Sequence, residues 1–177
     1  MKKSVKGLWV LIMALVLVFS IAACSSSDNS SASKDTKTDD KDALLQKQKD
    51  ITNYETEVQA AMSSAYEPVA GIASFAGVAD DAYDANAVKA YVDQAKQASD
   101  TFNSTVDGLT IPKTLSDKDQ TQIQEAIKDI KDFYAQKAEA AKKALDAKNG
   151  EELATINEDI DKAGQDSFDA FSTKFND

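Results

Sequence analysis

The chain has 177 residues, with 30 acidic and 20 basic side chains and a formal net charge of −10. All the basic residues are lysine, and such an acidic surface repels nucleic acid and anionic lipid head groups. One cysteine and no histidine exclude an intrachain disulfide, zinc sites built from Cys and His, and the usual Ser-His or Cys-His catalytic pairs. The composition therefore predicts a protein that is not an enzyme and uses no metal or cofactor.

The N-terminal residues have the parts of a bacterial secretory signal. Three lysines lie among the first six residues, and an unbroken apolar run follows at Leu8–Phe19. Even extended to Ala23 this run has 16 residues. As a helix it is about 24 Å long, short of the roughly 30 Å hydrocarbon core of a membrane. The pattern predicts a signal peptide at 1–23, and the alternative is an uncleaved membrane helix.

The tetrapeptide Ile21, Ala22, Ala23 and Cys24 resembles the lipobox of bacterial lipoproteins. The resemblance covers residues 1–24 only. It implies that the thiol of Cys24 receives a diacylglyceryl group and that a dedicated signal peptidase, recognising Ile21, Ala22 and Ala23, cuts before it. Two acyl chains then hold the mature protein at the extracytoplasmic face of the cell membrane. The absence of arginine favours a Gram-positive source.

A polar segment separates this cysteine from the rest of the chain. Residues 25–41 consist almost entirely of Ser, Asp, Lys, Thr and Asn, which cannot bury enough surface to offset the entropy of ordering. We therefore expect residues 24–41 to form the lipidated cysteine and a flexible tether, and residues 42–177 to form the folded domain.

The domain carries four apolar stripes with helical spacing. The first lies between residues 42 and 78 and contains Pro68, which predicts a kink or break there. The second runs from Val88 to Val106 and should end at Gly108; the third starts after Ser116 as N-cap and should run to Lys148. The fourth runs from Leu153 to Phe171 and beyond. These stripes predict an all-α, elongated antiparallel four-helix bundle with a thin, alanine-rich core.

Two groups of side chains are candidates for ligand or partner contact. Asp80, Asp81 and Asp84 could offer oxygens to a cation, but capping of the next helix by Asp81 or Asp84 explains them as well. Tyr66 and Tyr83 could gather near the predicted kink and bind a ligand, or could simply pack at the end of the bundle.

The acidic residues around the fourth stripe are the remaining candidates for acid–base chemistry. A carboxylate pair could come from six acids there, but most of them fall off the apolar stripe, which is typical of a solvated face. The six are Glu151, Glu152, Glu158, Asp159, Asp161 and Asp166.

Three hypotheses for function follow. The first is a non-enzymatic module that contacts an envelope protein or the cell wall, the second a receptor for a small ligand or cation near Pro68 and Asp80–Asp84, and the third an enzyme using carboxylates alone.

Overall fold

The computed structural model describes residues 36–176, with side chains for residues 41–174. The predicted signal peptide 1–23, the lipobox residues Ile21, Ala22, Ala23 and Cys24, and residues 24–35 of the predicted tether lie outside the described residues. The first described element is helix α2 (Thr36–Ala73), so residues 36–41 of the predicted tether are helical.

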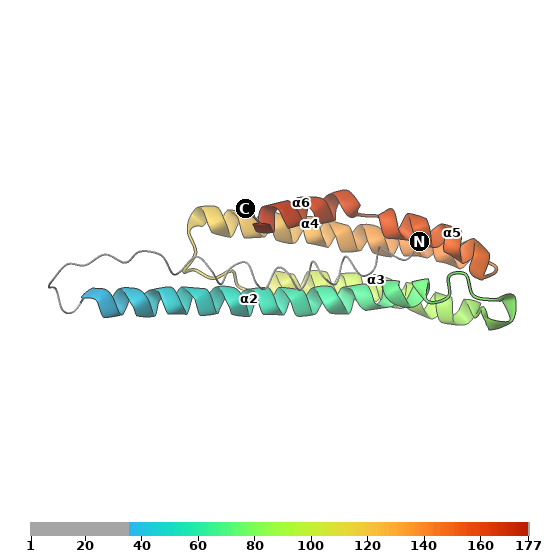
Figure 1. The fold of residues 1–177 in the computed structure, drawn as a ribbon, viewed down its shortest axis with the longest axis horizontal. Coiled ribbons are helices and arrows are strands. Elements are labelled where there is room, and N and C mark those ends of the chain that lie inside the picture. Colours follow the sequence, from blue (N-terminus) through green and yellow to red (C-terminus); the bar gives the residue numbers. More distant parts are fainter. Residues whose placement is uncertain (1–35, 177) are drawn as a thin grey trace, which may run out of the picture.

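The described residues form an antiparallel all-α bundle, as the four stripes predict. Two short 3-10 helices, η1 (Asp80–Ala82) and η2 (Lys142–Asp146), join the longer ones, which are α2, α3 (Ala85–Gly108), α4 (Asp117–Ala141), α5 (Gly150–Lys162) and α6 (Gln165–Asn176). Figure 1 shows α3 returning along α2, and α5 and α6 together returning along α4. Helix α2 packs mainly against α3, and α4 mainly against α6.

No helix in the described part of the chain combines the length and the apolar character that crossing a membrane requires.

Helix α2 continues through Pro68 to Ala73. Proline has no backbone N–H, so the carbonyl of Ser64, four residues earlier, loses its helical donor at this point. The side chain of Pro68 is buried. The predicted kink at this position stays a prediction.

Polar side chains and a glycine mark the ends of α3 and α4. The hydroxyl of Ser116 accepts a hydrogen bond from the amide of Asp119 at 3.2 Å, which confirms the predicted N-cap of α4. Helix α3 ends at Gly108 as predicted, but Gly108 is not left-handed; the positive φ angles among the described glycines belong to Gly77 and Gly164. The prediction that the third helix runs to Lys148 is wrong, because α4 ends at Ala141 and the chain tightens into η2.

The fourth predicted helix is divided into α5 and α6. Gly164 has a φ of 76°, a left-handed conformation that glycine adopts without strain and that breaks the helical path. A Cβ at this position would lie 2.9 Å from the carbonyl oxygen of Phe133, so the joint also lets two backbones approach closely. The apolar spacing continues across the joint, which is why the stripe alone predicts a single helix.

Two hydrophobic clusters lie end to end along the bundle. The aromatic cluster is built from large rings and their neighbours: Tyr54, Val58, Met62, Ala65, Phe102, Val106, Ala126, Ile127, Ile130, Phe133, Tyr134, Phe168 and Phe171. The aliphatic cluster contains smaller side chains: Val69, Ile72, Val88, Val92, Ala95, Ala141, Ala144, Ala147, Leu153 and Ile160. The predicted alanine-rich core describes the second cluster only.

The rings of the aromatic cluster pack directly on one another. Those of Phe102 and Tyr134 have centroids 4.8 Å apart, and those of Phe133 and Phe168 are 5.3 Å apart. Phe133 lies beside the predicted stripe of the third helix rather than on it. It is buried because α6 covers that side of α4.

Candidate functional site

The acidic turn predicted as a possible cation site is used to start α3. Asp84 is the N-cap: one carboxylate oxygen accepts from the amides of Asn86 at 2.9 Å and Ala87 at 3.1 Å. The capping alternative is therefore confirmed for Asp84, while the side chains of Asp80 and Asp81 are exposed. Among the side chains of residues 41–174, no three or more of His, Cys, Asp or Glu gather in a way that could hold a metal ion.

The two tyrosines predicted near Pro68 pack in different places. The hydroxyl of Tyr83 donates to the carbonyl of Ala147 at 3.0 Å, and its ring lies against the aliphatic cluster. Tyr66 packs against the aromatic cluster, where burial raises its pKa and the neighbouring carboxylate of Asp161 raises it further. Tyr83 thus ties the turn before α3 to the residue after η2. Ligand contacts by Tyr66, Asp81 and Tyr83 stay predictions.

A long open groove runs between α2 and α3, and we call it the α2–α3 groove. It has a volume of about 680 Å³. The side chains lining it are small or uncharged, apart from one glutamate: Glu57, Ala60, Ala61, Ser64, Ala65, Pro68, Gln94, Gln97, Ala98, Thr101, Phe102, Thr105 and Leu109.

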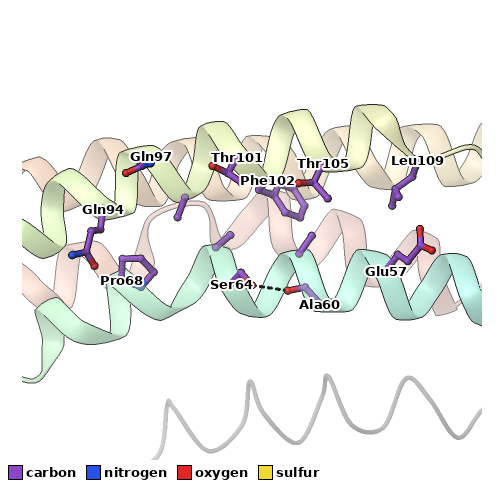
Figure 2. Close-up of a pocket in the computed structure, with 13 residues that line it drawn as sticks. Glu57, Ala60, Ser64, Pro68, Gln94, Gln97, Thr101, Phe102, Thr105 and Leu109 are labelled. Atoms are coloured by element: carbon purple, nitrogen blue, oxygen red, sulfur yellow. Dashed lines mark hydrogen bonds between the residues drawn. The ribbon is translucent and has the colours of Figure 1, made fainter.

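The α2–α3 groove has an apolar floor and a polar rim. Figure 2 shows Gln94, Gln97, Thr101 and Thr105 along the α3 side, opposite the α2 residues, which include Pro68. The hydroxyl of Ser64 is bonded to the carbonyl of Ala60 at 3.1 Å, within its own helix. The amides and hydroxyls of α3 therefore supply most of the hydrogen-bonding groups at this rim.

The groove is electrostatically unlike the rest of the chain. The whole sequence has 28% charged residues, yet the groove is lined by a single carboxylate, that of Glu57, and no lysine. A charged ligand finds no partner of opposite sign here other than this carboxylate. The chemistry suits an uncharged surface with apolar atoms in its centre and hydrogen-bonding atoms at its edges.

A second cavity lies where the start of α4 faces α2. It has a volume of about 380 Å³, and its wall is mainly apolar, with residues such as Ile51, Pro112, Leu115 and Ile123. Glu55 lies in the same wall, and burial raises the pKa of its carboxyl group. This cavity is distant in sequence from the predicted Asp80–Asp84 site.

Lys137 is a buried cation that the stripe pattern overlooks. Its side chain is 4% exposed, and its Nζ donates to the carbonyls of Ile160 and Asp161, each at 2.7 Å. The amine also lies 5.4 Å from the ring centroid of Phe133. These carbonyls belong to the last turn of α5, where a positive charge complements the helix dipole.

The surroundings of Lys137 act on its pKa in two directions. Burial lowers the pKa of Lys137, while the carboxylate of Asp161 acts in the opposite direction. Asn157 donates to the same carboxylate at 3.5 Å, and its own carbonyl oxygen is buried without a hydrogen-bond partner. A signal for this lysine exists in the sequence, because position 137 continues the spacing of Ile130 and Tyr134 on the buried face of α4.

The acids of the fourth stripe are spread over the surface of α5 and α6. Glu151, Glu152, Glu158, Asp159 and Asp166 are all exposed, and Asp161 is half-buried beside Lys137. Asp161 is therefore the one member of this group that is not exposed, and its neighbours include Tyr66, Lys137 and Asn157.

Comparisons with known proteins add no relative. No protein-family model matches the chain, and searches of curated proteins and of solved structures find no match either.

Proposed function

We propose that the chain is a lipid-anchored extracytoplasmic protein that acts without catalysis, by binding a partner protein in the α2–α3 groove. The anchor rests on the order of sequence elements in residues 1–24, ending in Cys24. The binding role rests on one observation, an open groove of about 680 Å³ lined almost entirely by uncharged side chains in an acidic protein.

The shape and chemistry of the groove favour a protein segment as partner. Alanines at positions 60, 61 and 98 leave room for another backbone to approach α2 and α3 closely. The glutamines and threonines of α3 can donate and accept hydrogen bonds at the rim of such a contact. An uncharged segment with small apolar side chains fits both features, and a partner of this kind in the cell envelope is the one we propose. A cell-wall glycan is the competing occupant.

The anchor is tested by replacing Cys24. In the Cys24→Ala variant we expect complete loss of the lipid mass and of cleavage before residue 24, because the thiol is the only proposed attachment point. Intact mass of the membrane-extracted protein measures both events. Ser25→Ala is the matched control and should be processed normally. Normal cleavage and membrane sedimentation of Cys24→Ala would contradict the anchor.

The groove is tested by filling it. Ala60→Trp places a large ring at an exposed position on the α2 wall, and we expect partner binding to weaken about tenfold or more. The measurement is photocrosslinking in intact cells from a benzophenone side chain at position 101, on the opposite wall. Ala135→Trp, at an exposed position of α4 outside the groove, is the control. Equal protein adducts from both variants would contradict a partner in this groove, and adducts to glycan alone would reassign the occupant.

A further inference from the structure

The start of α2 projects beyond the rest of the bundle. The hydroxyl of Thr114, just before α4, donates to a carboxylate oxygen of Asp50 at 3.5 Å, so the connection between α3 and α4 meets α2 near this residue. Figure 1 shows the first turns of α2 extending past the connection between α3 and α4. We call residues 41–49 the projecting segment; apart from Lys47, which is half-buried, their side chains are exposed.

Two adjacent leucines are exposed on this segment. Leu44 is 66% exposed and Leu45 is 65% exposed, and with Leu145 they are the large hydrophobic side chains most open to solvent among those described. Leu44 continues the spacing of Ile51 and Val58, so the seam that α2 buries inside the bundle extends onto a part of the helix that none of the other described helices covers.

The charges around the leucines form a self-complementary row. Asp42, Leu45 and Lys49 are spaced by three and four residues and therefore lie along one line of the helix surface. When a second copy is laid against the first in the opposite direction, Asp42 of each copy faces Lys49 of the other. A twofold-symmetric contact requires such self-complementarity. In a parallel pair, Asp42 of one copy faces Asp42 of the other and Lys49 faces Lys49, so like charges repel.

We propose that two copies of the chain associate through their projecting segments, antiparallel, with Leu45 at the centre, Leu44 at the side of the contact, and an Asp42–Lys49 ion pair at each end. The segment is too short to bury the roughly 1,200–2,000 Å² of a standard stable interface. Association is therefore weak between free copies and is strengthened when both are held on one surface, which raises their effective concentration. Only this strengthening rests on the proposed anchor.

Cysteine crosslinking of the full chain in intact cells tests the pairing. Two differently tagged copies carry Asp42→Cys and Lys49→Cys, and a short bis-maleimide reagent joins them. We expect about tenfold more mixed dimer than from Asp42→Cys with Lys96→Cys, an exposed position on α3. A copy without an added cysteine controls for reaction at Cys24. Mixed dimer no greater than in the Lys96→Cys pair overturns the proposal, whether a bilayer, another protein or a parallel partner covers the leucines.

A charge swap separates specific pairing from chance collision. With Gln46→Cys as the crosslinking position, which keeps both leucines, Asp42→Lys should reduce the dimer because each row then carries two lysines. Adding Lys49→Asp to that variant exchanges the positions of the positive and negative charges, so opposite charges again face each other in the antiparallel pair. The double variant should therefore restore the dimer. Crosslinking that ignores both changes overturns the antiparallel register. All three positions are exposed, so circular dichroism should show unchanged helix content.

Discussion

Replacing Lys137 with methionine is expected to lower the free energy of unfolding by about 2 kcal/mol or more. Methionine keeps the long unbranched shape but provides no donor. The carbonyls of Ile160 and Asp161, which accept from Lys137 at 2.7 Å each, then lose their partner at the end of α5. Urea titration of residues 36–177, followed by circular dichroism, measures the change. The loss should be partly offset because a buried cation is removed with the hydrogen bonds.

The matched control for this prediction is a lysine on the surface. Lys96 of α3 is exposed and pairs with Asp100, one turn along the same helix, so Lys96→Met should leave the stability nearly unchanged. If Lys137→Met were equally neutral, the two hydrogen bonds would do no more than compensate for burying the charge, and Lys137 would not hold the end of α5.

The Gly150→Ala variant is expected to lose about 3 kcal/mol or more of stability. A Cβ at Gly150 would lie 2.3 Å from the carbonyl oxygen of Val78 and 2.6 Å from its amide nitrogen, and neither backbone atom can turn aside as a side chain can. The amide of Gly77 also donates to the carbonyl of Gly150, at 2.6 Å. The start of α5 must therefore move away from the segment that follows α2.

Gly108 provides the opposite case at the end of α3. A Cβ there meets nothing within 4 Å, and the residue has helical rather than left-handed backbone angles. Gly108→Ala should therefore stabilise the protein by about 0.4–1 kcal/mol, because it restricts the unfolded chain. Similar melting temperatures for the two alanine variants would show that the contact between Gly150 and Val78 relaxes without cost.

The local rules of helix formation account for most of the fold. The 3.6-residue spacing predicts the four stripes, and the caps at Asp84 and Ser116 are confirmed because a side chain and an amide two or three residues away determine them. Gly164 was missed because the apolar spacing continues through it, so only its φ of 76° reveals the joint between α5 and α6.

The candidate site depends on contacts between different helices, and the spacing of residues along one helix does not predict such contacts. The α2–α3 groove exists because small residues of two helices meet at the same level, and that register is set by tertiary packing. Lys137 occupies a buried position of its stripe, but its partners are carbonyls 23 and 24 residues further along the chain. The proposed anchor, in contrast, is a continuous motif and can be recognised from residues 1–24 alone.

Because the two clusters lie end to end, the local stability of the bundle should differ between its two halves. Large rings close the half nearest the start of α2, whereas valines, isoleucines and alanines close the half containing the turns before α3 and α5. Opening the second half exposes less buried apolar area to water and therefore costs less free energy, so local opening should begin there. In a protein attached through its N-terminus, local opening would then occur mainly at the end of the bundle farthest from the attachment, and the end beside the attachment would open less often.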